Sequence, residues 1–416
     1  MISIRAAVFF VFALLIPASA GASGFALWAN GAAELGECNS VLAHTEGPAS
    51  NFFNPALLPE LDGTYIEIGT SIIRPSMDFK SELTGNSVRA EDRTFYPSTL
   101  FISHKLNDGF TVGLGVNNTF GLATEWPDDW EGRYITTKAE LVTVNINPNI
   151  AWRVTDKLTL AAGVDFLVGD TTLKQKLNFS FFGLSDGDQK FKADGDGYGY
   201  NVGLLYKIAE NLALGISYRS EIKLDFNGDV SFGFPSGTPP ILIAFFPDTG
   251  GKVDLDLPAQ AFIGLSYSPF DKLMLEIGGK WEGWSSYDTL NLKLSEPVLG
   301  SNIIVLTKSW RDVYGFNFGI KYDINSTSAI SAGYLYEGNP VPDGTFEPSV
   351  PSSDRDDFSF GIQKTFGGFA FALTYLFEKY HSRHKENTVG LDSGLTANGR
   401  YKQHAHIVGL AGSYKF

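Results

Sequence analysis

The chain of 416 residues contains a single cysteine, Cys38, so the protein has no internal disulfide bond. Beyond residue 22, no stretch has the roughly 18 consecutive apolar residues that a transmembrane helix needs. The sequence contains no H-E-x-x-H zinc motif, no phosphate-binding P-loop and no glycine pattern of a dinucleotide-binding fold. These absences exclude a disulfide-stapled domain and a helical membrane protein. We expect no enzymatic activity, no cofactor and no binding of nucleic acid.

Aromatic and apolar residues are abundant instead: 33 Phe, 17 Tyr and 7 Trp are present, and 44% of the chain is hydrophobic. Residues 1–22 have the parts of a secretory signal, with Arg5 before the apolar run 6–16 and small-residue cleavage sites after Ala20 or Ala22. We therefore expect a signal peptide over residues 1–22. An exported, aromatic-rich chain of this kind is either a secreted β protein or an outer-membrane barrel.

Long segments of the chain alternate with a period of two residues. In 212–219 (LALGISYR) and in 330–336 (ISAGYLY), large apolar side chains fall on one face and mostly small or polar ones on the other. This alternation is typical of strands between lipid and a polar lumen. A soluble β-sandwich alternates in the same way, but its strands usually have about 5–6 residues. Segments 158–181 and 211–234 are far longer, which favours a barrel.

Short and long connections alternate strictly along the chain. Tight turns are expected at 107–109, 155–157, 209–211, 269–271, 324–326 and 367–368. Longer loops are expected near 81–94, 126–137, 182–190, 235–251, 295–305, 338–353 and 384–399. Short periplasmic turns and long outer loops are the pattern of bacterial barrels. Six turns and seven loops connect fourteen strands, so the sequence predicts an all-β fold, a 14-stranded antiparallel transmembrane β-barrel over residues 61–416.

The two ends of the expected barrel carry further signals. Residues 23–60 are rich in Gly and Ala and lack the two-residue period. A fourteen-stranded barrel lies between barrels filled by side chains and open porins of about 16–18 strands, so its lumen leaks unless it is plugged. We therefore expect residues 23–60 to form an N-terminal hatch (plug) inside the barrel. The last strand ends on Phe416, which resembles the C-terminal signal recognised by the barrel assembly machinery.

Several short motifs occur in the order in which one known family has them. They are Ser23–Leu27, the N-P-A motif of Asn54, Pro55 and Ala56, Asn118–Glu125, Tyr218–Phe226, Trp310–Asp312 and Pro351–Arg355. On these motifs the chain resembles the FadL/TodX family of outer-membrane transporters for long-chain fatty acids and other hydrophobic compounds. The resemblance covers nearly the whole mature chain. The N-P-A motif alone is a weak signal, whereas the ordered set on a fourteen-strand pattern is a strong one.

The resemblance implies a monomer in the outer membrane of a Gram-negative bacterium, surrounded by lipid and lipopolysaccharide. It also implies passive transport. A hydrophobic molecule is caught at the outer loops and enters an internal apolar pocket. It then leaves sideways at an inward kink of the third strand after the hatch rearranges. The substrate stays open between long-chain fatty acids, aromatic hydrocarbons such as toluene, and other lipophilic molecules.

The third expected strand has the residues that a kink and a gap need. Glycines allow a bend or bulge, and polar side chains can hydrogen-bond backbone groups that a gap leaves unpaired. The local sequence fits an ordinary lumen-facing strand equally well. With the resemblance, the candidate lateral gate comprises Gly113, Gly115, Asn117, Asn118, Thr119, Phe120 and Gly121.

In the hatch, the Asn54 amide is expected to hydrogen-bond the backbone of the wall or of the hatch. The alternative is that the hatch is a purely structural plug.

Two further sets of residues are candidates for contact with a ligand. Arg311 and Arg355 are candidates for binding a carboxylate head group, and a lumen salt bridge is the alternative for each. The outer loop 235–251 carries a candidate capture groove, made of Ile241, Leu242, Ile243, Phe245 and Phe246. Packing over the barrel mouth is the alternative. The loop between strands five and six is short compared with better-known family members, which leaves the shape of the groove open.

No metal site is expected from the closely spaced histidines. His381 and His384, like His404 and His406, lack a clear third ligand, so we expect solvated side chains. Two functional alternatives to a transporter remain. An outer-membrane phospholipase-like enzyme needs a Ser–His pair on adjacent strands at the lipid face, and a general porin needs an open, ion-conducting lumen.

Overall fold

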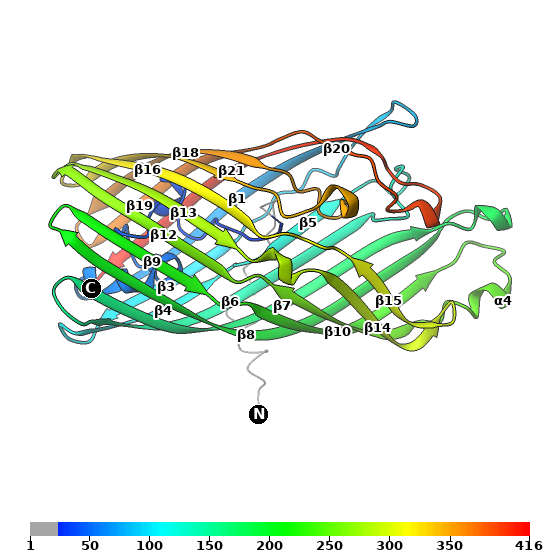
Figure 1. Ribbon diagram of the computed structural model, residues 1–416, viewed down its shortest axis with the longest axis horizontal. Coiled ribbons are helices and arrows are strands. Elements are labelled where there is room, and N and C mark those ends of the chain that lie inside the picture. Colours follow the sequence, from blue (N-terminus) through cyan, green and yellow to red (C-terminus); the bar gives the residue numbers. More distant parts are fainter. Residues whose placement is uncertain (1–23) are drawn as a thin grey trace.

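The computed structural model describes residues 24–416, and the expected signal peptide lies outside the described residues. The described chain is dominated by β-strands (Figure 1). Its longest helix, the 3-10 helix η1 (Pro55–Glu60), has six residues. No helix of residues 24–416 is long and apolar enough to cross a membrane.

The strands and helices have the following bounds. The strands of the first half are β1 (Thr64–Ser81), β2 (Ser87–Arg89), β3 (Ser98–Lys105), β4 (Phe110–Asn117), β5 (Gly121–Glu125), β6 (Lys138–Arg153), β7 (Leu158–Leu177), β8 (Gly187–Ala209), β9 (Leu212–Arg219) and β10 (Ile222–Gly233). Those of the second half are β11 (Thr249–Leu257), β12 (Gln260–Phe270), β13 (Leu273–Glu282), β14 (Thr289–Val298), β15 (Ser301–Thr307), β16 (Val313–Asn325), β17 (Ser328–Glu337), β18 (Arg355–Phe366), β19 (Phe369–Tyr380), β20 (Arg383–Lys385) and β21 (Gly399–Lys415). The remaining helices are α2 (Ala32–Leu35), α3 (Ser50–Phe53), η2 (Ser180–Phe182), α4 (Pro240–Ile243), η3 (Trp284–Ser286), η4 (Asp343–Thr345) and η5 (Leu391–Ser393).

The strands form one antiparallel sheet that closes on itself, because β1 pairs with β21 along its length. Seven crossings of the wall consist of two strands in line: β2 with β3, β4 with β5, β9 with β10, β11 with β12, β13 with β14, β15 with β16, and β19 with β20. The 21 strands of residues 24–416 therefore make fourteen crossings. The predicted fold, a closed antiparallel barrel of fourteen strands, is confirmed (Figure 1).

Side chains along each strand alternate between the outside and the lumen. On β18, Phe358 and Phe360 are about half exposed, whereas Ser359 between them is buried. Near a tight turn, the exposed rings of Phe110 and Trp152 stack with their centroids 6.2 Å apart. An outward apolar band with aromatic rings at its edge suits a surface that faces lipid.

The connections differ at the two ends of the barrel. The tight turns and the C-terminus lie at the left end of Figure 1, and the long loops and α4 lie at the right end. The prediction of a long loop near 295–305 is wrong, because β14 and β15 continue through these residues. They meet at Leu299 and Gly300, which have φ of 51° and 80°. Two successive residues with positive φ match the twist of the flanking strands, so a hairpin replaces the loop.

Residues 24–60, here called the hatch segment, lie within the barrel (blue in Figure 1). Its helix α2 contacts β18, β19 and β21, while η1 contacts β6, β7 and β8. Wall glycines make room for it. A Cβ atom at Gly333 would lie 2.3 Å from the carbonyl carbon of Glu37, and one at Gly215 would lie 1.8 Å from the carbonyl oxygen of Leu42. The hatch backbone therefore packs directly against the wall at these points.

Candidate functional site

The N-P-A motif joins α3 to η1. Asn54 has an extended backbone and caps η1, because its Oδ1 accepts a hydrogen bond from the Ala56 amide at 3.1 Å. Pro55 takes the first helical position, where no N–H is needed. The Asn54 Nδ2 donates to the carbonyl oxygens of Leu42, at 2.8 Å, and of Leu204 on β8, at 3.0 Å. The amide thus joins two parts of the hatch segment to the wall, at β8 and not at the third crossing.

The third crossing of the wall is interrupted between β4 and β5. Asn117 at the end of β4 pairs with Asn145 of β6, and Gly121 at the start of β5 pairs with Val142. Three residues of the third crossing therefore lie opposite two residues of β6, which is a bulge. Among residues 24–416, β5 pairs with β6 alone, so its other edge has no strand beside it.

The start of the hatch segment occupies this open edge. The Leu27 amide donates to the Thr119 carbonyl at 2.8 Å, and the Gly121 amide donates to the Phe25 carbonyl, also at 2.8 Å. Residues 25–27 thus act as a short strand at the interruption. They satisfy backbone groups that an open edge leaves unpaired, which is the condition for a break in a membrane barrel.

Polar side chains satisfy the remaining backbone groups of the interruption. The Asn118 Nδ2 donates to the Thr143 carbonyl at 2.6 Å, and the Phe120 amide donates to the Thr143 Oγ1 at 3.2 Å. The Asn118 amide donates to the Oδ1 of Asn30 in the hatch segment at 3.3 Å. The interruption is held by side chains from both the wall and the hatch.

Two of the candidate gate glycines lie away from the interruption. Gly113 and Gly115 belong to the regularly paired part of β4. A Cβ atom at Gly113 would lie 2.2 Å from the Oδ1 of Asn51, and one at Gly115 would lie 2.7 Å from its Nδ2. The missing side chains at these positions make room for α3 of the hatch segment.

An aromatic cluster encloses the ring of Phe25. The ring centroids of Trp284, Trp310, Tyr287 and Phe120 lie 4.6, 5.6, 5.7 and 6.4 Å from that of Phe25. All five side chains are buried. Each aromatic pair of this kind contributes about 0.5–1.5 kcal/mol beyond the burial of its area. The cluster therefore fixes the start of the hatch segment beside the interruption.

A cavity of about 370 Å³ inside the barrel has Phe25 in its wall. Its apolar lining includes Leu122, Leu141, Phe191, Phe226, Val253, Leu255, Leu290 and Leu292. Its polar lining includes Gln175, Gln189, Lys308 and Glu347. Further polar residues, among them Lys138, Glu140 and Lys174, complete the lining. A cavity of this size that combines an apolar surface with polar groups suits a small amphipathic or hydrophobic ligand.

Lys308 and Glu347 form an ion pair in the wall of the cavity. Burial alone would lower the pKa of Lys308, but the nearby carboxylate of Glu347 outweighs it and raises that pKa. Burial likewise opposes ionisation of Glu347, but Lys308 and a hydrogen bond from Ser349 at 2.7 Å lower its pKa. Both groups are therefore charged at neutral pH.

The two candidate head-group arginines lie elsewhere. Arg355 is buried and forms ion pairs with Glu337 at 2.7 Å and with Asp357 and Glu378 at 3.3 Å. It lines a separate cavity of about 20 Å³. Arg311 is exposed, and its backbone amide bonds to an outer loop. Neither arginine is part of the lining of the larger cavity in the described chain.

The candidate capture groove lies on α4 and the residues after it, at the loop end of the barrel (Figure 1). Ile241, Ile243 and Phe245 are 71, 39 and 51% exposed. Leu242 and Phe246 face inward, where Phe246 packs against other aromatic rings. The loop therefore presents an exposed apolar surface anchored by a buried aromatic side chain.

Residues 183–187 spell G-x-S-x-G, the string that surrounds the nucleophile of many hydrolases. That string works on a sharp turn between a strand and a helix. Here it follows η2 in an outer loop and leads directly into β8. It is not a nucleophile elbow.

The sequence did not single out Phe25, Trp284 or Tyr287 as members of one cluster. Phe25 and Trp310 lay inside motifs of the resemblance, and nothing in the local pattern of either motif showed that the two rings meet. The cavity lining was also missed, because its residues come from many strands and loops that lie far apart in the sequence. The sequence did hold one signal for the cavity: several strands carry large apolar residues on their lumen-facing side near the outer loops.

The chain matches a family model described as "Outer membrane protein transport protein (OMPP1/FadL/TodX)" over residues 13–416. It is 26% identical to a 47 kDa outer membrane protein of Pasteurella multocida, over 97% of this chain and 96% of that one. It is 26% identical to a long-chain fatty acid transport protein of Escherichia coli O6:H1, over 85% of each chain.

Two solved structures have a similar fold. A Pseudomonas aeruginosa FadL homologue superposes with a TM-score of 0.84 at 19% identity, covering 94% of this chain and all of that one. The Pseudomonas putida toluene transporter TodX superposes with a TM-score of 0.74 at 19% identity, covering 93% of this chain and 98% of that one. At these identities the similarity supports the fold.

Proposed function

Because the chain belongs to the outer membrane protein transport family (OMPP1/FadL/TodX), we propose that it carries long-chain fatty acids or similar hydrophobic molecules passively across the outer membrane. The family places the chain in the outer membrane, among transport channels for hydrophobic compounds and not among enzymes. Beyond this family membership, we propose a substrate and a route.

The physical chemistry of the cargo favours a route that avoids water. Each CH₂ group gains about 0.8 kcal/mol on leaving water, so a sixteen-carbon tail resists an aqueous pore by roughly 12 kcal/mol. A path of apolar surfaces with an exit into lipid removes most of that barrier. A water-filled pore would retain it.

The proposed route begins at the exposed apolar surface of Ile241, Ile243 and Phe245. From there the molecule enters the cavity of about 370 Å³, where the apolar lining takes the tail. Polar groups of the lining, including Gln175 and Gln189, can face a head group. A monoaromatic hydrocarbon needs only the apolar part of this lining.

One observation carries the proposal: Phe25 lines the cavity, and its carbonyl oxygen also accepts the hydrogen bond from the Gly121 amide at the interruption. A ligand that displaces the Phe25 ring also disturbs the backbone at the open edge of β5. Removal of residues 25–27 from that edge exposes a passage from the cavity into the bilayer. The hatch segment is proposed to act as the movable plug of this passage.

A cavity-filling substitution tests the route. Leu255 is buried and lines the cavity, so Leu255→Trp reduces the space for a ligand. Uptake of a labelled long-chain fatty acid, measured in cells that depend on this protein, is expected to fall to near the level of cells without it. The matched control is Ile263→Trp on β12, where the side chain is 51% exposed on the outside of the barrel.

Full uptake by a correctly assembled Leu255→Trp variant would overturn the internal route. Mass spectrometry of ligands that copurify with the native protein distinguishes fatty acids from aromatic hydrocarbons. Conductance in planar bilayers tests the remaining alternative. Large, stable ion currents through the native protein would favour a general porin.

A further inference from the structure

Buried acidic side chains gather where the middle of the hatch segment meets the wall. The carboxylates of Glu37, Glu46 and Glu276 are each at most 1% exposed. His44 lies among them, and its side chain is 7% exposed. Lys321 of β16 bonds Glu46. Burial of charged groups costs free energy unless each charge is paired, and here three buried carboxylates face one lysine and one histidine.

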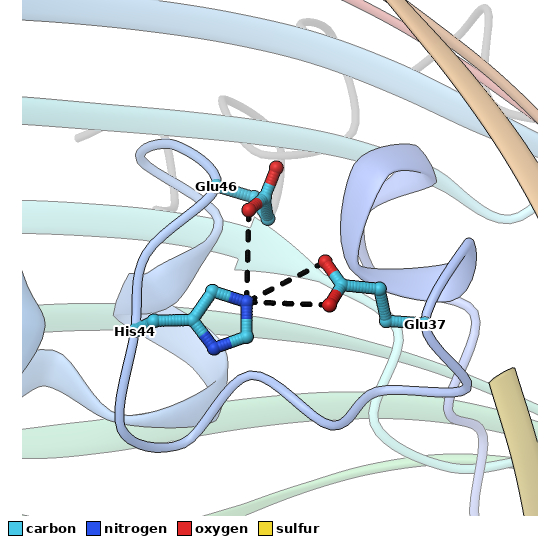
Figure 2. Close-up of side chains that lie close together, drawn as sticks. All are labelled: Glu37, His44 and Glu46. Atoms are coloured by element: carbon cyan, nitrogen blue, oxygen red, sulfur yellow. Dashed lines mark hydrogen bonds and ion pairs between the residues drawn. The ribbon is translucent and has the colours of Figure 1, made fainter. Parts of the chain in front are cut away.

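Both ring nitrogens of His44 face carboxylates, one at hydrogen-bonding distance and the other at longer distances. Its Nδ1 lies 2.8 Å from the Oε2 of Glu276 on β13. Its Nε2 lies 3.4 and 3.5 Å from the two carboxylate oxygens of Glu37, and 3.6 Å from the Oε1 of Glu46. Figure 2 shows Glu37 and Glu46 approaching the same ring nitrogen from two directions. These distances are long for charge-assisted hydrogen bonds, which are about 2.7–2.9 Å.

We propose that Glu37, His44 and Glu46 bind a divalent transition-metal cation of the Zn²⁺ class. One nitrogen or oxygen atom from each of the three lies within 4.8 Å of the others. Zinc bonds to nitrogen and oxygen are about 2.0–2.2 Å, and tetrahedral angles then separate the ligand atoms by about 3.4 Å. The measured separations of the His44 Nε2 from the two carboxylates match that spacing.

The Glu37 carboxylate gives independent support. It is completely buried, and its Oε2 has no hydrogen-bond partner in the described chain, yet it points at the His44 Nε2 (Figure 2). A buried carboxylate oxygen left without a donor is costly. A cation between Glu37 and His44 would satisfy it.

The groups around these three ligands are those that a metal site needs. Glu276 also accepts the backbone amides of Leu42 and Ala43, at 2.6 and 3.0 Å, so its position is fixed. A carboxylate that binds the Nδ1–H of a histidine directs the lone pair of the Nε2 toward the metal. Glu46 is oriented in turn by Lys321 and Gln363, each at 2.7 Å.

The charges favour a divalent cation. With a neutral imidazole, the three carboxylates and the ammonium group of Lys321 leave two negative charges, which one divalent cation balances. The proposed site also lies next to an open cavity. An open cavity of about 410 Å³ at the turn end of the barrel is lined by Lys321 and Gln363, the two residues that hold Glu46.

The experiment uses the full mature protein, without a histidine tag, purified in detergent and stripped of metal by a chelator. Titration with Co²⁺ at neutral pH is expected to give one equivalent of binding and the intense visible absorption of a tetrahedral site. Zn²⁺ is expected to displace the Co²⁺ and abolish the absorption. The conservative variant Glu37→Gln is expected to weaken Co²⁺ binding by roughly tenfold or more, and Glu276→Gln by roughly 10–100-fold.

The matched control is His384→Gln, since His384 is half exposed in the outer part of the barrel, away from the hatch. Folding of each variant is checked by the shift of the intact barrel on electrophoresis without heating. Absence of stoichiometric binding to the native protein would overturn the proposal and leave a network of ion pairs around a protonated His44. Binding retained in folded Glu37→Gln would overturn it as well. The readout needs no transport, so it is independent of the proposed function.

Discussion

The backbone amide of Gly121 in the wall donates a hydrogen bond to the carbonyl oxygen of Phe25 in the hatch segment, at 2.8 Å. This bond joins the start of the hatch to the interruption of the third crossing. The ring of the same Phe25 lines the internal cavity. One residue of the hatch segment therefore contacts both the cavity and the closed wall.

A disulfide bond across this junction is expected to block transport. Ala26 and Phe120 form an antiparallel bridge between the two flanking hydrogen bonds. Ala26 and Phe120 are thus a non-hydrogen-bonded antiparallel pair, in which the two Cα atoms lie about 4.5 Å apart. That distance is within the range of about 4.4–6.8 Å that disulfides allow. The double variant Ala26→Cys with Phe120→Cys should lose uptake on oxidation, to the level of cells without the protein, and regain it on reduction.

The single variants Ala26→Cys and Phe120→Cys serve as controls for the loss of each side chain. The native Cys38 is buried and donates to Ser359, so it does not compete for the new thiols. Undiminished uptake by the fully oxidised double variant would show that residues 25–27 need not leave the open edge.

The barrel could be predicted from the sequence because its signal is local and repeated. In segments such as 212–219, apolar and small or polar residues alternate, which indicates the side of the wall that each residue faces. Tight turns such as 107–109 interrupt this pattern at intervals. Register then follows, because a slip by one residue would place apolar side chains in the lumen. The error at 295–305 arose where β15 is exposed at nearly every position, so its side chains do not alternate between two environments.

The candidate site could be predicted only in part. The third strand and Asn54 carry short motifs, so the resemblance located them, although Asn54 bonds to β8 and not to the interruption. The cluster around Phe25 and the group around His44 join residues that are far apart in the chain, such as His44 and Glu276. No local pattern encodes such contacts, because they depend on how the hatch segment folds inside the barrel.

Asn54→Ala is expected to loosen the hatch segment without unfolding the barrel. The substitution removes the cap of η1 and two hydrogen bonds, to the Leu42 and Leu204 carbonyls. Loss of a cap and of buried partners costs about 2–4 kcal/mol in total. We expect this decrease in the free energy of unfolding in denaturant, together with slower uptake, because the hatch no longer holds its position.

The matched control is Asn302→Ala on the exposed hairpin of β15, where the effect on unfolding should stay within about 0.5 kcal/mol. A folded Asn54→Ala protein with native stability and native uptake would show that the N-P-A motif only fills space in the lumen.

The ion pair of Lys308 and Glu347 is expected to make the barrel less stable in acid. The pKa of Glu347 in the folded protein is lowered below its usual value of 4.5, against the effect of burial, because Lys308 stabilises the carboxylate. Its contribution is therefore complete above the unfolded pKa and is lost as the pH falls through the folded pKa. The difference in melting temperature between the native protein and Glu347→Gln should be largest at pH 7 and shrink below about pH 4. Other acidic groups titrate in both proteins, so this difference isolates Glu347. A difference that stays constant from pH 7 to strongly acidic solution would show that the pair does not contribute to stability through its charge.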